Sequence, residues 1–275
     1  MQDRRLAIFG ITGRMGQSIL RALREEPGWC LSGALASAHS SRLGEDAGGA
    51  AAPTGVRISA DPAAALLDAA GRKAAVALDF SNAAAVPLHA RACAAAGVPL
   101  LVGTTALQAE CLAALAHAAE AIPVLVAPNT SVGVGVLGEL VRFAARALPQ
   151  SYDVEIHEAH HRLKRDAPSG TALKLGELVA QARGQELAQV ALYDRHGAEA
   201  LRAPGSIGFS VVRGGDIVGE HTVIFAGAGE RLEITHRATD RDVFARGALK
   251  AAEWLAGRSA GTYSMQDVLT SVSRA

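Results

Sequence analysis

The chain has 275 residues, with 27 acidic and 27 basic side chains, so its formal net charge is zero. Hydrophobic residues make up 49% of it, which suits a globular protein of one or two domains with a full core. The balanced charge makes nucleic acid and anionic membranes poor partners. No apolar run reaches the ~20 residues of a membrane helix, and the apolar stretch near the N-terminus is too short for a signal peptide. The three cysteines lack C-x-x-C spacing. We therefore expect a cytoplasmic protein with reduced thiols.

The chain begins with the pattern of a strand, a glycine turn and a helix. Leu6–Phe9 is apolar, Gly10-Ile-Thr-Gly13-Arg-Met-Gly16 follows it, and Gln17–Glu25 is amphipathic. Glycines let such a turn tighten and let the backbone approach a pyrophosphate at the helix N-terminus. The spacing is G-x-x-G-x-x-G instead of G-x-G-x-x-G, so the motif alone is a weak indication.

Strands and helices alternate through the first half of the chain, which predicts a parallel sheet covered by helices. Three of the strands end in loops of small polar residues, and open α/β sheets bind ligands at the carboxyl ends of their strands. Together with the first turn, these loops outline a dinucleotide site. The further strands are expected at Cys30–Ala36, Ala74–Phe80, Val98–Val102 and Pro123–Ala127, the helices at Ala83–Ala96 and Gln108–Ala119, and the loops at Asp79–Asn82, Gly103–Thr105 and Ala127–Ser131.

After Pro149 strands dominate, which favours an α+β domain with a mixed or antiparallel sheet. One helix, Thr171–Ala182, interrupts them, and a later amphipathic helix, Val243–Leu255, is expected to return to the first domain. For His221 and His236 a structural role inside strands is the favoured interpretation. The strands are expected at Val154–His157, Ala188–Asp194, Gly208–Arg213, His221–Ala226 and Arg231–His236.

The segment from Glu155 to Ala172 carries histidines and cations directly before a helix start. Ser169 can cap that helix, and the N–H groups of Gly170 and Thr171, aided by the helix dipole, favour a carboxylate or phosphate. Lys164 lies just before this turn. The segment therefore predicts a site for an anion and a proton.

The same segment matches the H-E-x-x-H pattern of zinc peptidases at His157-Glu-Ala-His-His161. Two histidines at i and i+4 share a metal only on a helix. The preceding residues alternate as a strand does, which would put His157 and His160 on opposite faces. We therefore expect no metal site, and ordinary surface or core histidines remain an alternative to a functional role.

With these motifs in view, the chain resembles the dihydrodipicolinate reductases, also called 4-hydroxy-tetrahydrodipicolinate reductases, over nearly its whole length. The most specific elements are Glu158-Ala-His-His-Arg-Leu-Lys164 and Asp166-Ala-Pro-Ser-Gly-Thr171, supported by the glycine turn, Gly103-Thr-Thr105 and the segment Gly208–His221. The resemblance implies hydride transfer from NADPH or NADH to a cyclic dicarboxylate that loses water in diaminopimelate and lysine biosynthesis.

It further implies a Rossmann-like domain at residues 1–128 and 243–275, and a substrate-binding and oligomerisation domain at 129–242. A hinge would join the two domains, and the second domain's sheet would assemble a homotetramer. His160 would be the catalytic acid/base and Lys164 a proton donor. The substrate would contact His161, Ser169, Gly170 and Thr171, and the cofactor would contact Gly10, Ile11, Thr12, Gly13, Arg14, Met15, Ser37, Gly103, Thr104, Thr105, Ala127, Pro128, Asn129 and Thr130.

Two departures from the family pattern concern the cofactor. The acid that commonly ends the second strand and holds the adenosine ribose is replaced by Ala36, followed by Ser37, His39, Ser40 and Ser41. Such an acid binds the 2′-hydroxyl of NAD and repels the 2′-phosphate of NADP, so its absence, with Arg42 or Arg14 in reach, favours NADPH. The third loop also has Thr130 in place of a common aromatic and Gly135 in place of a common Asn.

Two other classes of function compete with this interpretation. A non-catalytic dinucleotide-binding module needs only the fold, and would not need His160 and Lys164 beside a helix start. A semialdehyde dehydrogenase would need a nucleophilic cysteine, but Cys93 and Cys111 fall inside expected helices.

Overall fold

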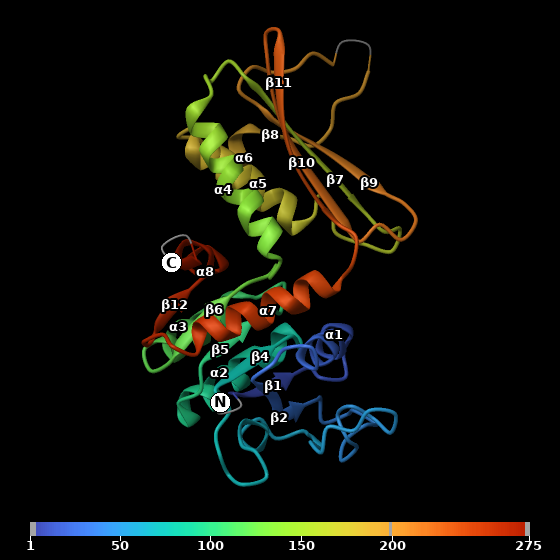
Figure 1. The fold of residues 1–275 in the computed structure, drawn as a ribbon. Coiled ribbons are helices and arrows are strands. Elements are labelled where there is room, and N and C mark those ends of the chain that lie inside the picture. Colours follow the sequence, from blue (N-terminus) through green and yellow to red (C-terminus); the bar gives the residue numbers. More distant parts are fainter. Residues whose placement is uncertain (1–3, 198–199, 273–275) are drawn as a thin grey trace. The chain divides into compact units, whose positions relative to one another are not determined.

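The computed structural model describes residues 4–197 and 200–272 and divides into two compact units (Figure 1). Unit 1 comprises Met1–Val132 and Asp242–Ala275, and unit 2 comprises Gly133–Arg241. None of the helices in the described part of the chain is long and apolar enough to cross a membrane.

Unit 1 is built on a seven-stranded sheet in the order β12-β6-β5-β4-β1-β2-β3, and all of its strand pairs are parallel. The Rossmann-like sheet expected from the alternating pattern is thus confirmed. The strands are β1 (Arg4–Phe9), β2 (Trp29–Leu35), β3 (Ile58–Ser59), β4 (Val76–Asp79), β5 (Leu100–Val102), β6 (Pro123–Val126) and β12 (Gly261–Tyr263). The helices are α1 (Arg14–Leu23), α2 (Val86–Ala96), α3 (Ala109–Ala119), α7 (Asp242–Leu255) and α8 (Met265–Val272), with short 3₁₀ turns at Ala64–Leu66 and Ala83–Ala85.

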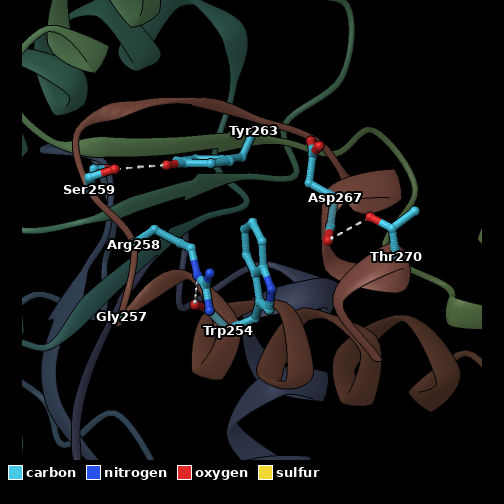
Figure 2. Close-up of a pocket in the computed structure, with 7 residues that line it drawn as sticks. All are labelled: Trp254, Gly257, Arg258, Ser259, Tyr263, Asp267 and Thr270. Carbon is cyan, nitrogen blue, oxygen red and sulfur yellow. Dashed lines mark hydrogen bonds between the residues drawn. The ribbon is translucent and has the colours of Figure 1, made fainter. Parts of the chain in front are cut away.

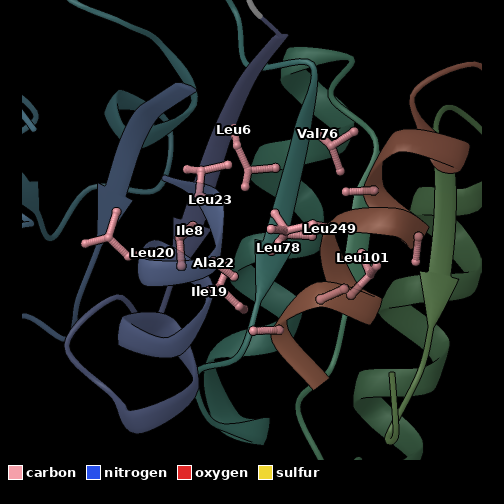
Figure 3. Close-up of a cluster of buried hydrophobic side chains, with 14 of the residues drawn as sticks. Leu6, Ile8, Ile19, Leu20, Ala22, Leu23, Val76, Leu78, Leu101 and Leu249 are labelled. Carbon is pink, nitrogen blue, oxygen red and sulfur yellow. The ribbon is translucent and has the colours of Figure 1, made fainter. Parts of the chain in front are cut away.

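Both faces of this sheet are buried. Alternate residues of each strand point to opposite faces, so each strand contributes to both buried layers. In β1, Leu6 and Ile8 face the cluster under α1 and α7, whereas Ala7 and Phe9 face the cluster under α2 and α3. Figure 3 shows the first cluster, in which Leu249 of α7 lies beside the strands. This three-layer packing fixes the carboxyl ends of the strands, where the loops of interest begin.

Unit 2 is built on a mixed five-stranded sheet in the order β11-β10-β7-β9-β8. The central strand β7 pairs antiparallel with β10 and parallel with β9. The mixed sheet of an α+β domain is confirmed. Its strands are β7 (Asp153–His160), β8 (Ala191–Leu192), β9 (Ile207–Arg213), β10 (Gly219–Gly227) and β11 (Glu230–Ala238), and its helices are α4 (Val132–Ala147), α5 (Gly170–Ala182) and α6 (Leu187–Val190).

One face of this second sheet packs against helices. Val154 and Ile156 of β7 form a buried cluster with Leu137 of α4 and Leu175 of α5. The even-numbered residues of β7 share this side, so Glu158 and His160 continue the row beyond the apolar core. The odd-numbered residues, such as Glu155 and His157, lie on the opposite face.

In unit 1, β3, β12 and α8 were not expected, and unit 2 differs from the expectation in two places. Of the strand expected at Ala188–Asp194, only Ala191–Leu192 form a strand, β8, and the residues before it belong to helix α6. Leu187, the first residue of α6, lies against Gly176 of α5. The helix α4 was not expected, because its glycines lower its intrinsic helix propensity. Burial of Leu137 and Val141 against unit 2 compensates for that low propensity.

Candidate functional site

The first glycine turn is too crowded for side chains. Gly10 has φ +81°, and a Cβ on it would lie 2.5 Å from the Phe80 carbonyl oxygen. A Cβ on Gly16 would lie 2.3 Å from the Gly10 carbonyl oxygen. Gly13 caps α1 in an extended conformation with no side-chain cap, and the first turn of the helix has no acidic residue. The turn therefore presents the start of a ten-residue helix without a competing internal anion, which fits a pyrophosphate.

Asp79 ties the next two loops of unit 1 together. Its carbonyl oxygen accepts hydrogen bonds from Gly103 N at 2.9 Å and Thr104 N at 3.2 Å. Its buried carboxylate lies 2.8 Å from Nδ1 of His89 in α2 and also accepts from the Thr104 hydroxyl. A Cβ on Gly103 would lie 2.1 Å from the Phe80 ring, so only glycine fits there. Asp79 belongs to the expected loop Asp79–Asn82, but the sequence patterns indicated neither a role for its carboxylate nor the contact with His89.

The third loop of the expected cofactor site joins β6 to α4. Ala127 N donates to the Val102 carbonyl at 2.8 Å, which ties the loop to β5. Asn129 Oδ1 accepts from Ser131 N at 2.9 Å, and the Thr130 hydroxyl donates to the Phe244 carbonyl at 2.7 Å. The polar side chains of this loop therefore fix its own shape, and the loop lies at the same strand edge as Gly103.

The loop after β2 carries the residues expected near the adenosine. Ser37 Oγ accepts from His39 N at 3.2 Å. Arg42 does not extend freely, because its Nε lies 3.1 Å from Glu45 Oε2 and its Nη2 donates to the Asp46 carbonyl. Much of the positive charge that could meet a 2′-phosphate is thus shared with Glu45.

Glu158 and His160 form a buried pair at the end of β7. His160 Nδ1 lies 2.6 Å from Glu158 Oε2. His160 is 9% exposed and Glu158 is 0% exposed. Burial lowers the pKa of His160, the charges of Lys164 and Arg213 lower it further, and Glu158 opposes them. The ring is therefore neutral near pH 7 and can exchange a proton.

Arg213 of β9 holds Glu158 with two nearly equal hydrogen bonds. Its Nη1 and Nη2 each lie 2.7 Å from a different oxygen of the Glu158 carboxylate. Nη2 also donates to the Asp166 carbonyl, in the loop between β7 and α5. Burial alone would raise the pKa of Glu158, but Arg213, His160 and Ser169 N–H together hold it below its ordinary value. Glu158 is therefore ionised.

His221 of β10 joins this network from the other side. Its Nε2 lies 3.0 Å from Ser169 Oγ, and its ring meets that of His160 edge to face at 5.1 Å between centroids. Burial, followed by the charge of His160, lowers the pKa of His221 to about 4. The sequence favoured a purely structural His221, but the structure puts it in contact with the expected catalytic histidine. Arg213 and His221 lie over fifty residues from His160, so no local motif identifies them.

The helix start that follows is already arranged around carboxylates. Ser169 Oγ accepts from Ala172 N at 3.2 Å and its N–H donates to Glu158, so Ser169 is a buried cap of α5. Lys164 Nζ lies 2.9 Å from Asp166 Oδ1, and the same carboxylate accepts from Gly170 N–H. An internal carboxylate thus lies where a substrate carboxylate was expected.

The remaining expected residues of unit 2 lie close to these. His161 directly follows β7, and its carbonyl accepts from Lys164 N at 3.1 Å. Thr171 is the second residue of α5. The structure thus brings His160, His161, Lys164 and the start of α5 together at one end of β7.

The H-E-x-x-H segment has strand geometry, as expected. His157 lies on the opposite face of the sheet from His160, with its Nδ1 2.9 Å from Ser210 Oγ. Among the residues that the structure describes, no group of three or more His, Cys, Asp or Glu could hold a metal ion.

A hollow in unit 1 lies away from these loops (Figure 2). Gly261, at the start of β12, pairs with Pro123, the first residue of β6, so this region adjoins the amino ends of the strands. The Tyr263 hydroxyl donates to the Ser259 carbonyl at 3.1 Å, and the Arg258 guanidinium lies over the Trp254 ring, 4.5 Å from its centroid. Because the loops expected to bind the cofactor lie at the opposite strand ends, this hollow is separate from them. Its lining residues are Trp254, Gly257, Arg258, Ser259, Tyr263, Asp267 and Thr270.

Comparisons with known proteins agree with this arrangement. Residues 4–130 match the family model described as dihydrodipicolinate reductase, N-terminus, and residues 133–269 match the model of its C-terminus. A 4-hydroxy-tetrahydrodipicolinate reductase of Anaeromyxobacter dehalogenans is 52% identical over 267 residues, 96% of this chain and 97% of the relative. One from Thiobacillus denitrificans is 49% identical over 266 residues, 96% of this chain and 98% of the relative.

Solved structures show the same fold. A dipicolinate-bound dihydrodipicolinate reductase from Paenisporosarcina sp. TG-14 superposes with a TM-score of 0.76 at 24% identity, covering 98% of this chain and 100% of that one. Both family models match, and the curated relatives share about half of their residues with this chain. The chain belongs to the dihydrodipicolinate reductase family and is a nicotinamide-dependent oxidoreductase.

Proposed function

We propose roles for individual residues in the reaction that family membership assigns to this chain. That reaction is the NAD(P)H-dependent reduction of 4-hydroxy-2,3,4,5-tetrahydrodipicolinate to 2,3,4,5-tetrahydrodipicolinate with loss of water, in diaminopimelate and lysine biosynthesis. The observation that carries the residue roles is a neutral, carboxylate-bound His160 beside a lysine and a helix start.

His160 is the acid/base and Lys164 a proton donor. The nicotinamide supplies the hydride when it is bound, and the carbon or nitrogen that receives electrons must then gain a proton. His160 is almost buried and its pKa lies below the ordinary value, so it gives up a proton readily. Lys164 carries its charge on a side chain that is 22% exposed, next to the same loop. His160 can take up a proton and pass it to the substrate, and Lys164 can donate the proton that replaces it.

The substrate carboxylates bind at the start of α5. The N–H groups of Gly170 and Thr171, the helix dipole, and the side chains of His161 and Lys164 offer donors for a dianion. A Cβ at Gly170 would meet nothing within 4 Å, so a ligand can approach its backbone closely. Both polar groups of Ser169 are engaged inside the protein, so we propose that it shapes this site through its cap.

Unit 1 holds the cofactor. The glycine turn provides the pyrophosphate site at Gly10, Ile11, Thr12, Gly13, Arg14 and Met15. The loops after β5 and β6 supply Gly103, Thr104, Thr105, Ala127, Pro128, Asn129 and Thr130, and Ser37 lies at the adenosine end. In this assignment residues 1–128 and 243–275 bind the cofactor, and residues 129–242 bind the substrate.

NADPH is the preferred cofactor, with NADH accepted. No acid stands at the end of β2 to repel a 2′-phosphate, and Ser37 and His39 can donate to it. The Arg42–Glu45 contact tempers this preference, because Arg42 must reorient to add its charge. We expect kcat/KM for NADPH to exceed that for NADH by a few-fold, measured with freshly generated substrate. A clear preference for NADH would contradict this account of the loop.

The enzyme is a homotetramer in the cytoplasm, assembled through the second sheet. The face of that sheet away from α4 and α5 carries His157, Ser210 and Thr222, and no described helix of unit 2 packs on it. Val212, on this face, is 41% exposed. An open sheet face of mixed polarity suits a symmetric subunit contact.

A further inference from the structure

We propose that Glu158 is a positioning residue that fixes the tautomer of His160. The inference rests on the proton-transfer role proposed for His160, but it concerns a different residue and a different property. In this assignment the Glu158 carboxylate holds the proton of the neutral ring on Nδ1, and Nε2 is left unprotonated to exchange the proton of the reaction.

The hydrogen bonds of Glu158 leave one choice for that ring. Oε1 accepts from Ser169 N–H at 2.9 Å and from Arg213 Nη2 at 2.7 Å. Oε2 accepts from Arg213 Nη1 at 2.7 Å and lies 2.6 Å from His160 Nδ1. An ionised carboxylate only accepts hydrogen bonds, so His160 Nδ1 must be the donor. All four contacts of this buried carboxylate are then satisfied.

Charged and titratable groups face His160 from every element packed against it. Glu158 lies on its own strand β7, Arg213 on β9, His221 on β10, and Lys164 in the loop before α5. Glu158 favours the protonated ring, whereas the charges of Lys164 and Arg213 disfavour it. Loss of the Glu158 charge therefore changes both the tautomer and the pH at which His160 titrates.

The opposite side of the ring is kept open. A Cβ on Gly219 of β10 would lie 3.1 Å from His160 Nε2, closer than an ordinary contact. Gly219 does not have a positive φ, so the backbone itself does not require glycine. The space beside Nε2 is thus preserved while Nδ1 is bonded, which is the arrangement needed for proton exchange at Nε2.

Replacing Glu158 with Gln should reverse the tautomer. A Gln amide has one oxygen, and placing it toward Ser169 N–H and Arg213 Nη2 satisfies two donors. The NH₂ group then takes the place of Oε2, where it cannot accept from Arg213 Nη1 but donates to His160 Nδ1, which moves the ring proton to Nε2. A neutral ring protonated at Nε2 cannot accept a proton there, so turnover falls at every pH.

The experiment measures the ring of His160 directly, in the full-length protein. Histidine-ring ¹⁵N NMR spectra, assigned with His160→Ala, should show an Nδ1–H tautomer in the wild type and an Nε2–H tautomer in Glu158→Gln. The titration of His160 should move to lower pH in the variant, and kcat should fall by roughly 10²-fold or more. Glu158→Asp keeps a carboxylate, so it should restore the wild-type tautomer and part of the activity.

Glu155→Gln is the matched control. Glu155 lies on the same strand and pairs with Arg195 and Arg202, but it faces away from His160. The Glu155→Gln variant loses an arginine-paired carboxylate of β7 that does not contact the His160 ring. The titration of His160 and the pH profile of kcat should therefore match the wild type.

Two results would overturn the proposal. One is an Nε2–H tautomer of His160 in the wild-type protein. The other is a Glu158→Gln protein with unchanged tautomer and titration of His160. If the tautomer reverses but His160→Ala keeps full activity, the positioning by Glu158 stands and the proposed role of His160 fails.

Discussion

Lys164 is shared between an internal carboxylate and the expected substrate. The Asp166 carboxylate pairs with Lys164 Nζ and accepts from Gly170 N–H, so it engages two donors that a dicarboxylate would use. Burial alone would raise the pKa of Asp166, but the hydrogen bond and the positive charge of Lys164 hold it below its ordinary value. Binding of a substrate carboxylate must therefore compete with a side chain that is ionised at neutral pH.

Replacing Asp166 with Asn should tighten the binding of dicarboxylates. Removing the charge frees Lys164 and lessens repulsion of the ligand. Asp166 is 58% exposed, and exposed ion pairs are weak, so the affinity for the dicarboxylate should rise by only roughly 3- to 10-fold. The measurement is the inhibition constant of pyridine-2,6-dicarboxylate. Asp194→Asn, which removes an exposed carboxylate of the same unit paired with His196, is the control. Weaker inhibition in Asp166→Asn would mean that Asp166 orients Lys164 for the ligand.

The sequence predicted those residues of the candidate site that lie in one continuous segment. His160, Lys164 and the cap Ser169 belong to a continuous motif, and the structure brings them together. Arg213 and His221 come from other strands, and their approach to His160 depends on the register of β7 with β9 and β10. That register follows from packing of the whole sheet, so local spacing could not reveal it.

The first turn of α5 is proposed to bind the ligand through its backbone N–H groups. Ser169 caps the helix, and Gly170 has neither a positive φ nor any atom within 4 Å of an added Cβ. Its glycine is therefore not required by the fold, which points to close approach of a ligand.

The Gly170→Ala variant should separate stability from binding. Its melting temperature should equal or slightly exceed that of the wild type, because alanine favours helix. Pyridine-2,6-dicarboxylate should inhibit it about 10-fold less well, because the methyl group blocks the backbone N–H groups. Gly103→Ala offers the contrast, since its Cβ would clash with Phe80 at 2.1 Å and should lower stability. Unchanged inhibition of a stable Gly170→Ala protein would exclude a carboxylate site at this position.

Elements with strong periodicity were predicted, and elements determined by tertiary packing were not. The strands around β1 and β4 are short buried runs, and the prediction of a parallel sheet is confirmed. Helix α4 has poor intrinsic propensity, and α6 forms where Leu187 packs on α5. In α4, burial of Leu137 and Val141 outweighs the low local preference. In α6 no residue is fully buried, but Leu187 and Val190 pack partly buried against the core of unit 2.

For the whole molecule, the buried histidines predict loss of stability in acid. The pKa of His221 falls from 6.5 to about 4 on folding, so the unfolded chain binds more protons between these pH values. Stability is therefore fully present above pH 6.5 and declines as the pH falls toward 4, by on the order of 3 kcal/mol at most from this group. His160, His236 and Glu158 have lowered pKa values and act in the same direction.

The His221→Gln variant should lose part of this pH dependence. Gln cannot titrate, so the urea midpoint should fall less between pH 7 and pH 4 than in the wild type, although stability at pH 7 also drops. His117→Gln, at a site whose side chain is 81% exposed, should leave the wild-type slope unchanged. An identical slope in wild type and His221→Gln would show that His221 is not protonated on unfolding.

The central claim is that His160 and Lys164 transfer the proton in the reduction. It is tested most directly by the steady-state kcat of His160→Ala and Lys164→Ala with freshly generated substrate. His157→Ala, on the opposite face of the same strand, serves as the control. We predict that kcat falls by roughly 10²-fold or more in both variants, while the dissociation constant of NADPH stays at the wild-type value. An unchanged kcat in both would contradict the assignment.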